Sequence, residues 1–256
     1  MTGPGEDYWR TLPLGPGTDV LLKDLNGVVA LGKPDGVLSH PNTPADEKRS
    51  VLVASYQLEK ECYEWKSELG VHRAYLLNRL DSGTSGVILA ATNEALALAL
   101  RSQFKSQRVK KIYQALVFGA PTPPVQVWRD RLAIQKRDGM VRTERAGNIP
   151  AEAQMRVLAR RTGFPPLTLI QLEPRTGRSH QLRVQCATRH LPIVGDATYG
   201  DFRANREFAK KTGQKRMFLH SAETRFDYEW AGRNYSFSAR APLPDEFEQC
   251  LSGRGN

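Results

Sequence analysis

Short runs of apolar residues, separated by glycine, proline and polar turns, recur along the whole chain. Most are too short for buried helices and are rich in β-branched and aromatic residues, which is typical of buried strands. We expect strands at residues 28–31, 74–77, 87–91, 112–118, 125–134, 153–159, 167–172, 217–220 and 235–237. The pattern therefore predicts a protein built around a sheet.

Fewer segments have the spacing of an amphipathic helix. We expect helices at residues 51–58, 94–104, 180–187 and 245–251. Polar residues that can cap a helix precede the first three: Ser50, Asn93, and either Thr176 or Ser179. The helices are thus expected to flank the sheet.

The segments between these elements indicate how the chain is organised. Residues 1–22 are rich in Gly, Pro and polar groups and are predicted to be an extended lead-in. A Pro and Gly turn predicts a hairpin of residues 28–31 with 37–40, and the polar segment 135–150 is expected to be a loop or hairpin tip. No repeat or long linker interrupts residues 23–256. We therefore predict an α+β fold, a single domain with a mostly antiparallel, mixed central sheet flanked by helices and loops.

Composition adds limits on location and redox state. Hydrophobic residues make up 40% of the 256 residues, which suffices for a core. The N-terminus lacks the pattern of a signal peptide, and no apolar run reaches the roughly 18 residues of a membrane span, so we expect a cytoplasmic protein. The three cysteines are scattered, which favours reduced, structural thiols: Cys62, Cys186 and Cys250.

Charge indicates the kind of partner. The formal net charge is +10, and much of the excess lies in two clusters. The first is Arg101, Lys105, Arg108, Lys110 and Lys111, and the second is Arg203, Arg206, Lys210, Lys211, Lys215 and Arg216. Such runs are either a merely basic surface or a site for phosphates, and their clustering favours a nucleic acid.

The most informative candidate for chemistry is Asp81, in a turn between the apolar runs 74–77 and 87–91. An aspartate at a turn is often only a cap or a hydrogen-bond acceptor. Here small residues let a large substrate approach the carboxylate: Ser82, Gly83, Ser85 and Gly86. An ionised carboxylate is already a nucleophile, and Arg79 beside it can bind phosphate or fill the gap left by a displaced base. These flanks favour a chemical role for Asp81.

Several motifs, in order, resemble those of the RluA-type pseudouridine synthases. Arg79 to Gly86 matches the family's Arg-Leu-Asp-x-x-Thr-Ser-Gly motif in full. The other matches are Lys33-Pro34-x-Gly36 with His40, Lys111-x-Tyr113, the run from Thr176 to Arg183, Gly195-Asp196 before Tyr199-Gly200, and Leu219-His220. Agreement of so many motifs in one order identifies the chain as a member of this family.

The resemblance implies isomerisation of a flipped uridine in rRNA or tRNA to pseudouridine, without metal or cofactor. It makes Asp81 the nucleophile, although its action on the ribose as a nucleophile or as a base stays open. Tyr113 would stack on the uracil and is a candidate to remove the C5 proton; its alternative role is that of a core strand tyrosine. Arg183 would pair with Asp81, with Arg178 as the second choice.

The same resemblance assigns contacts with RNA. Arg79 would occupy the place of the extruded nucleotide, Arg178 would touch backbone phosphate, and Leu219 would form an apolar wall of the uracil pocket. We expect the basic residues of the first cluster to bind RNA as well, in particular Lys105, Arg108 and Lys110. His180 is expected to be structural or to contact RNA. A metal site formed by His180, Cys186 and His190 is disfavoured because further ligands are absent nearby.

Two departures from the family pattern are visible. The residue before Arg79 is usually histidine and is Asn78 here, which can supply a hydrogen bond but no positive charge. Many relatives also carry an N-terminal S4-like RNA-binding domain, for which residues 1–22 are too short. We therefore expect a stand-alone, monomeric catalytic domain. The alternatives are a catalytically inactive RNA-binding relative and a different enzyme with an aspartate as glycosyl nucleophile.

Overall fold

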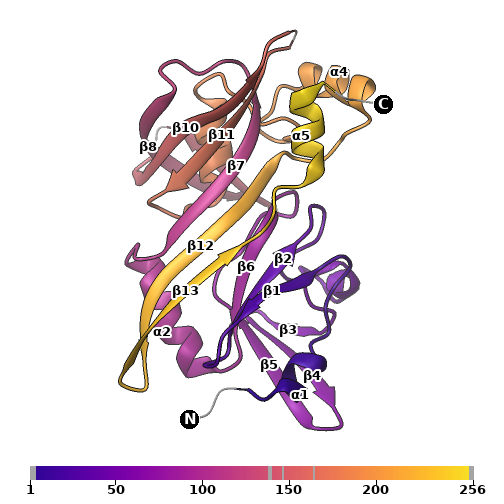
Figure 1. Cartoon of the computed structure of the whole chain (residues 1–256), viewed down its shortest axis with the longest axis vertical. Coiled ribbons are helices and arrows are strands. Elements are labelled where there is room, and N and C mark those ends of the chain that lie inside the picture. The colour runs from indigo at the N-terminus through magenta and orange to yellow at the C-terminus, as the bar shows by residue number, and fades with distance from the viewer. Residues whose placement is uncertain (1–3, 138–139, 146, 164, 254–256) are drawn as a thin grey trace. The chain divides into compact units, whose positions relative to one another are not determined.

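The computed structural model describes residues 4–137, 140–145, 147–163 and 165–253. Contacts divide the chain into two units (Figure 1). Unit 1 comprises the residues up to Val109 together with Glu223–Ala241, and unit 2 comprises Lys110–Ala222 together with the residues from Pro242 onward.

Unit 1 is built on antiparallel strands. Its strands are β1 (Asp19–Lys23), β2 (Val28–Lys33), β3 (Ser55–Gln57), β4 (Cys62–Ser67), β5 (Gly70–Leu76), β6 (Ser85–Ala91), the residues of β12 (Leu219–Trp230) from Glu223 on, and β13 (Arg233–Arg240). Hydrogen-bonded pairs connect them in the order β1, β2, β6, β5, β4 and β3, and β12 pairs with β13. β6 is buried along its whole length, as its unbroken apolar sequence predicts.

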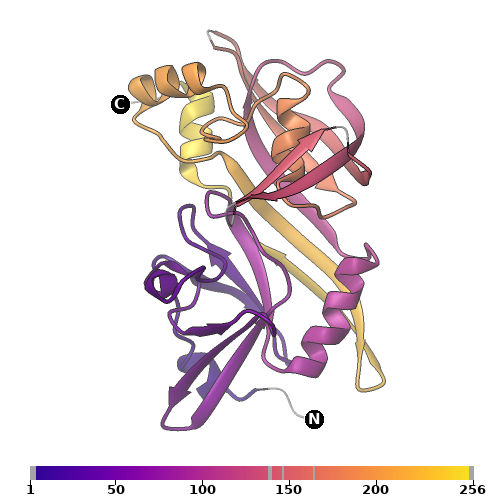
Figure 2. The same cartoon turned by 180° about the vertical axis from the view of Figure 1, so that it is seen from behind.

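Helix α2 (Glu94–Lys105) packs on this sheet, as Figure 2 shows from behind. Asn93 caps it, because its side chain accepts a hydrogen bond of 2.8 Å from the amide N–H of Leu96, and the predicted cap is confirmed. Leu96 and Leu100 are buried in a cluster with Val28 and Leu89 of the sheet. The helix thereby covers one face of β6.

The N-terminal segment carries more structure than an extended lead-in. A short helix, α1 (Glu6–Arg10), and the first part of β1 fall within residues 1–22. The Tyr8 ring lies 5.5 Å from that of Trp65, and its hydroxyl donates to the carbonyl of Arg73 at 2.6 Å. Aromatic packing therefore attaches this segment to unit 1.

Two local predictions in unit 1 are wrong. Residues 51–58 form no helix: burial alternates from Leu52 through Val53 and Ala54, the period of an extended chain, and β3 follows. The hairpin of β2 is made with the preceding β1 instead of residues 37–40, and Leu38 forms a parallel bridge with Ser50. Both errors occur where tertiary pairing overrides a weak local pattern.

Unit 2 is a second antiparallel array. Its strands are β7 (Lys110–Phe118), β8 (Val125–Arg137), β9 (Met140–Arg145), β10 (Ile149–Arg161), β11 (Leu167–Pro174) and the first residues of β12. They pair in the order β7, β11, β10, β8 and β9. β8 and β9 pair as a hairpin, so most of the segment 135–150, expected to be a loop or hairpin tip, is strand instead: β8 runs to Arg137, β9 is Met140–Arg145 and β10 begins at Ile149. The hairpin tip itself, residues 138–139, lies outside the described residues.

In the part of unit 2 that the structure describes, the helices are α3 (Gln181–Ala187), α4 (Phe202–Thr212) and α5 (Asp245–Ser252). α3 buries Leu182 and Cys186 in a cluster with Ile170 and Leu172 of β11. The predictions for α3 and α5 are confirmed, whereas α4 within the second basic cluster was not predicted. The α+β class with a mostly antiparallel sheet is also confirmed. Among the described residues, no helix is long and apolar enough to cross a membrane.

Candidate active site

Asp81 lies in the tight connection between β5 and β6, as predicted. Pairing of Tyr75 with Ala91 and of Leu76 with Ala90 closes the base of this connection. Within it, the amide N–H of Thr84 donates to the carbonyl of Asp81 at 2.9 Å. Gly86 has φ of +106°, a conformation that residues with a side chain rarely adopt, which explains the glycine that ends the motif.

The residue before Asp81 is fixed by Ser39. The Ser39 hydroxyl donates to the carbonyl of Leu80 at 2.7 Å and accepts from its amide N–H at 2.9 Å. The carbonyl of Ser39 in turn accepts from the hydroxyl of Tyr63 at 2.9 Å, and all three residues are buried. This support was not predicted from the sequence. These hydrogen bonds hold the backbone next to Asp81 in place, and they involve no atom of the Asp81 carboxylate.

Lys33 holds the other side of the turn. Its side chain is 1% exposed, and its ammonium donates to the carbonyls of Pro34, Val37 and Ser82 at 2.6 to 2.9 Å. The amide N–H of Gly36 also donates to Ser82, at 2.8 Å. The Lys33-Pro34-x-Gly36 motif therefore fixes the residue that follows Asp81.

The two residues before Leu80 have different roles. The Asn78 side-chain oxygen accepts a hydrogen bond of 2.8 Å from the amide N–H of Leu89 on β6. Asn78 thus anchors the turn, a structural role that sequence alone left unexplained. The Arg79 side chain is 56% exposed and lies 3.8 Å from a Glu61 carboxylate oxygen. Such an exposed, weakly held guanidinium can reach an RNA ligand.

In unit 2, Tyr113 and Leu219 contact the same hydrophobic cluster. Tyr113 is on β7 opposite Leu172 of β11 and is partly buried. It packs against the cluster that contains Leu182 of α3 and Leu219. The structure therefore brings together the predicted stacking residue, the predicted apolar wall and the helix that carries Arg183.

Arg183 forms a buried, bidentate ion pair with Asp196, a residue whose role was not predicted. Its Nε lies 2.7 Å from one carboxylate oxygen and its terminal nitrogen 2.8 Å from the other. The guanidinium also lies 5.0 Å from the centre of the Tyr199 ring. The predicted pairing of Arg183 with Asp81 joins residues of different units and stays a prediction. In the sequence, the Gly195-Asp196 motif is the feature that could have indicated Asp196 as the partner of Arg183.

The environment of Asp196 keeps it charged. Burial alone would raise the pKa of its carboxyl, but the hydrogen bonds and charge of Arg183 outweigh this effect and lower the pKa. The amide N–H groups of Thr198 and Tyr199 add hydrogen bonds of 2.8 and 3.0 Å to the same oxygen. The orientation of Arg183 is thus set by a loop outside its own helix.

The entry to α3 differs from the prediction. His180 is the N-cap residue, has φ of +52° and makes no side-chain capping bond, so the caps predicted at Thr176 and Ser179 are wrong. The Thr176 hydroxyl donates to the side chain of Gln181 at 2.7 Å instead. His180 Nδ1 lies 2.9 Å from the hydroxyl of Tyr199. This contact supports the structural alternative for His180.

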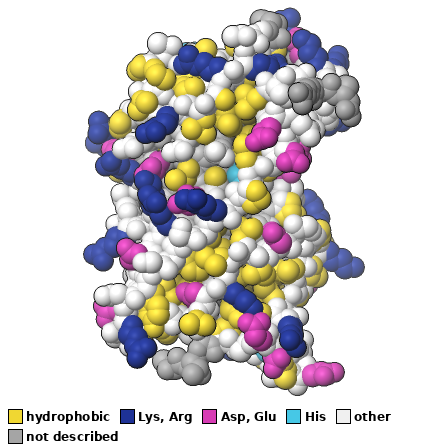
Figure 3. Space-filling view, viewed as in Figure 1, with side chains coloured by type: hydrophobic (Ala, Val, Ile, Leu, Met, Phe, Trp, Pro, Cys, Tyr) yellow, Lys and Arg dark blue, Asp and Glu magenta, His cyan; other side chains and the backbone are white. Residues whose placement is uncertain are grey.

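Arg178 and the first basic cluster provide cations at the surface. Arg178 is exposed and only weakly bound to the carbonyl of Pro150, at 3.4 Å. Lys105 and Arg108 are also exposed. Lys110 instead pairs with Glu173 at 3.0 Å. Figure 3 shows Lys and Arg side chains spread over the surface of each unit in this view.

Two further members of the first cluster are built into the structure. Arg101 donates to the carbonyl of Leu76 through Nε and a terminal nitrogen, at 2.9 and 2.7 Å. Lys111 is partly buried, and burial lowers the pKa of its ammonium. A Cβ atom added to Gly177 would lie 3.2 Å from the Lys111 ammonium, so the Lys111-x-Tyr113 and Thr176-Gly177-Arg178 motifs meet in unit 2.

The cysteines lie in the interior. Cys62, Cys186 and Cys250 are free and buried, and burial raises the pKa of each thiol. Over the described part of the chain, no group of three His, Cys, Asp or Glu side chains could hold a metal ion.

Comparison with known proteins identifies the family. The model of the family described as RNA pseudouridylate synthase matches residues 27–188, more than half of the chain. The chain is 31% identical over 242 residues to tRNA pseudouridine synthase C of Salmonella typhimurium strain LT2, covering 89% of this chain and 86% of that protein. The chain therefore belongs to the RNA pseudouridylate synthase family, as the motifs predicted. Members of this family are isomerases that act on RNA.

Other relatives are longer. Ribosomal large subunit pseudouridine synthase C of Vibrio parahaemolyticus is 35% identical over 185 residues, covering 70% of this chain and 54% of that protein. The chain likewise spans 57% of tRNA pseudouridine synthase C of Pectobacterium carotovorum. Among solved structures, Human RNA Pseudouridylate Synthase Domain Containing 4 matches with a TM-score of 0.65 at 23% identity, covering 91% of both chains. That likeness supports the fold.

Proposed function

We propose that this chain converts a uridine of tRNA or rRNA to pseudouridine with Asp81 as the essential carboxylate. The observation that carries the proposal is the rigid mounting of Asp81: Ser39 fixes the residue before it and Lys33 the residue after it. Two buried groups devoted to one turn are the kind of support that a reacting side chain requires.

The reaction is an isomerisation, so its atoms balance without a redox partner. The bond between N1 of uracil and C1′ of ribose breaks, the uracil turns, and a bond forms between C5 and C1′. C5 loses its proton and N1 gains one. The ionised Asp81 acts on the ribose, either as a nucleophile at C1′ or as a base, and both routes need the carboxylate charged.

Residues of unit 2 would hold the uracil. Tyr113 offers its ring for stacking and its hydroxyl as a candidate proton acceptor at C5, and Leu219 contributes apolar surface from the same cluster. Arg183, which Asp196 orients, is the candidate cation of the site, as the family resemblance implies. Arg79 is the candidate to fill the space of the extruded nucleotide.

The relatives act on two kinds of RNA, and the chain covers different shares of their lengths. The chain spans most of a tRNA pseudouridine synthase C but about half of a large ribosomal subunit enzyme. Because tRNA pseudouridine synthase C of Pectobacterium carotovorum is also covered over only 57% of its length, coverage does not separate the two substrates, and both tRNA and rRNA are examined. We also expect the protein to act as a cytoplasmic monomer.

The proposal is tested by incubating the purified protein with tRNA and with rRNA and mapping pseudouridine chemically. Discrete new pseudouridines are expected with the unmodified protein and none with Asp81→Asn. Asp7→Asn, a change of an exposed aspartate in α1, is the matched control and should leave the reaction unchanged. RNA binding without product in either fraction would favour the inactive RNA-binding relative. Equal rates for unmodified protein and Asp81→Asn would exclude Asp81 as the reacting group.

A further inference from the structure

Helix α4 has one face packed into unit 2 and one face in solvent. Figures 1 and 2 show the helix in orange at the periphery of this unit, beside α5. On the inner face, the Phe208 ring is buried, with its centroid 6.0 Å from that of Phe118 and 5.8 Å from that of Phe218. Aromatic packing therefore holds α4 at a fixed place on unit 2.

The inner face of α4 also contacts the loop that orients Arg183. The Asn205 side chain accepts a hydrogen bond of 2.8 Å from the amide N–H of Gly195 and donates one of 3.1 Å to the carbonyl of Asp196. The Asp196 carboxylate binds Arg183. Helix α4 is thus attached to the candidate site by both atoms of one amide group.

The outer face of α4 carries cations and one exposed aromatic ring. Phe202, in the first turn, is 55% exposed. It is followed at intervals of four residues by Arg206 and Lys210, so the three side chains form a row with about 6 Å between successive members. Lys211 lies beside this row, and all three cations are exposed. We call Phe202, Arg206, Lys210 and Lys211 the α4 face.

The cations of the α4 face are available to a ligand. Arg203, which is also exposed, pairs with Glu207 at 3.2 Å. In the part of the chain that the structure describes, no ion pair holds Arg206, Lys210 or Lys211. Lysines in a last turn also favour the helix dipole, but this effect accounts neither for the arginine in the middle of the helix nor for the exposed aromatic ring.

The second basic cluster does not lie on this face as a whole. The Arg216 side chain is only 7% exposed, and its guanidinium lies 5.3 Å from the centre of the Phe247 ring. Arg216 therefore stabilises the packing of unit 2. The structure separates it from the cations of the same cluster that point into solvent.

The chemistry of the α4 face fits single-stranded RNA. Cations beside an exposed aromatic ring bind such strands, because the cations contact phosphates and the ring stacks on an unpaired base. The spacing of the row is comparable to that of successive phosphates in a strand. A membrane surface fits less well, since an interfacial helix inserts its apolar face into lipid, and Phe208 on the apolar face of α4 is buried in unit 2.

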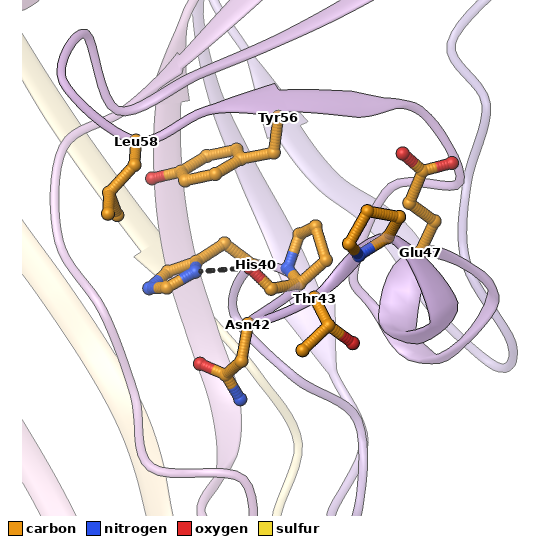
Figure 4. Close-up of a pocket in the computed structure, with 8 residues that line it drawn as sticks. His40, Asn42, Thr43, Glu47, Tyr56 and Leu58 are labelled. Atoms are coloured by element: carbon orange, nitrogen blue, oxygen red, sulfur yellow. Dashed lines mark hydrogen bonds between the residues drawn. The ribbon is translucent and has the colours of Figure 1, made fainter. Parts of the chain in front are cut away.

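An open pocket of unit 1 is a weaker candidate for contacts with the RNA backbone (Figure 4). Its volume is about 220 Å³, and its lining residues, all within the described part of the chain, include Glu47 but no Lys or Arg. The negative charge of Glu47 repels a phosphate. The α4 face provides the opposite charge.

We propose that the α4 face binds an unpaired segment of the RNA substrate, outside the nucleotide that reacts at Asp81. Arg206, Lys210 and Lys211 contact successive phosphates, and Phe202 stacks on one base. The inference rests on the proposed function, because the same RNA supplies this segment and the target uridine. It assigns to α4 a part in holding the substrate.

Binding of two short, fluorescently labelled strands tests the proposal. One is oligocytidylate, which contains no uridine, and the other is an abasic oligomer with the same number of phosphates. The triple variant Arg206→Gln, Lys210→Gln, Lys211→Gln should bind both strands more weakly, and its slope of log affinity against log salt should be smaller by about two. Phe202→Leu should weaken oligocytidylate binding by roughly tenfold, the order of one lost base stack, and leave the abasic strand and the salt slope unchanged.

A matched triple variant controls for net charge. Arg10→Gln, Lys48→Gln, Lys66→Gln removes one arginine and two lysines from exposed positions of unit 1 and should leave both affinities nearly unchanged. An equal loss in this control, or no loss in the α4 triple variant, would overturn the proposal. An unchanged oligocytidylate affinity in Phe202→Leu would overturn the stacking contact. Binding of anionic lipid vesicles that only the α4 triple variant loses, with RNA binding intact, would assign the face to a membrane instead.

These results are independent of catalysis. Asp81→Asn should make no pseudouridine yet bind oligocytidylate as the unmodified protein does. Weaker binding in the α4 triple variant, in a protein that modifies no RNA, would support the α4 face and contradict the proposed function. Unchanged binding in that variant of an active enzyme would do the reverse. In an active enzyme, the α4 triple variant should raise KM for the RNA substrate and leave kcat nearly unchanged.

Discussion

The Ser39 hydroxyl binds both the carbonyl and the amide N–H of Leu80, the residue that precedes Asp81. Ser39 and Leu80 are 41 residues apart in the chain, and both are buried. One hydroxyl thus satisfies two buried backbone groups that would otherwise lack partners. The position of Asp81 therefore depends on a side chain from a distant motif.

Replacing Ser39 with alanine tests this dependence. Ser39→Ala should lower the free energy of unfolding by about 1–3 kcal/mol, because it leaves buried polar groups of Leu80 unsatisfied. It should also lower the single-turnover rate more than the affinity for RNA. Urea unfolding and rapid-quench assays measure the two effects. Ser55→Ala is the control, since its hydroxyl bonds to the carbonyl of Glu64 on the exposed surface; an equal loss of turnover there would contradict the role of Ser39.

The Arg183–Asp196 pair predicts a stability that depends on pH. Because the folded-state pKa of Asp196 is lowered, its carboxylate stabilises the fold fully above the pKa of an unfolded aspartate, about 3.9, and less as pH falls through the folded value. Asp196→Asn leaves Arg183 buried without its charge partner and should cost about 3–5 kcal/mol at neutral pH.

This cost should shrink below about pH 4, where Asp196 takes up a proton in the unfolded chain of the unmodified protein while the folded state still keeps it charged, and it should be smallest once pH falls below the lowered folded pKa. Urea unfolding of both proteins between neutral and acid pH measures the difference. Asp227→Asn, a change at an exposed carboxylate, should show little effect at any pH. A difference between Asp196→Asn and the unmodified protein that stays constant into strong acid would contradict the assignment.

Tyr113→Phe separates stacking from proton transfer. The ring that packs on the cluster with Leu182 and Leu219 is kept, so RNA affinity and folding should be preserved. Turnover should fall by roughly 100-fold or more if the hydroxyl accepts the C5 proton, the usual size of a general-base contribution. Pseudouridine formation under single-turnover conditions measures this rate, and an unchanged rate would leave Tyr113 with the stacking role alone.

Sequence patterns predicted most of the strands, and α2 with its Asn93 cap, because long apolar runs and a capping residue act locally. The segment after Ser50 was misassigned, since its burial is set by contacts with Leu14 and Leu38 that are distant in sequence. The position of Asp81 in a turn was predictable from its flanking strands.

The residues that hold the site residues in place were harder to predict from the sequence. Ser39 and Lys33 bind backbone carbonyls of the Asp81 turn. Every residue type has the same backbone carbonyl, so the identity of the contacted residues does not indicate these bonds. Arg183 was recognised, but its bond to Asp196 depends on the path of the loop after α3. The pairing of Arg183 with Asp81 stays a prediction.

The first basic cluster should contribute unequally to RNA affinity. Lys105 and Arg108 are exposed, whereas Lys110 is paired with Glu173 and Arg101 is bound to the carbonyl of Leu76. Each cation that contacts a phosphate releases counterions, so its removal lowers the dependence of log affinity on log salt by about 0.7 to 0.9 for each contact. The double variant Lys105→Gln, Arg108→Gln should therefore flatten this slope by more than one, while Lys110→Gln should change it little. Anisotropy titrations of tRNA at several salt concentrations measure the slopes. An unchanged slope in the double variant would show that Lys105 and Arg108 do not touch RNA, and an equal change in Lys110→Gln would show that RNA displaces its bond to Glu173.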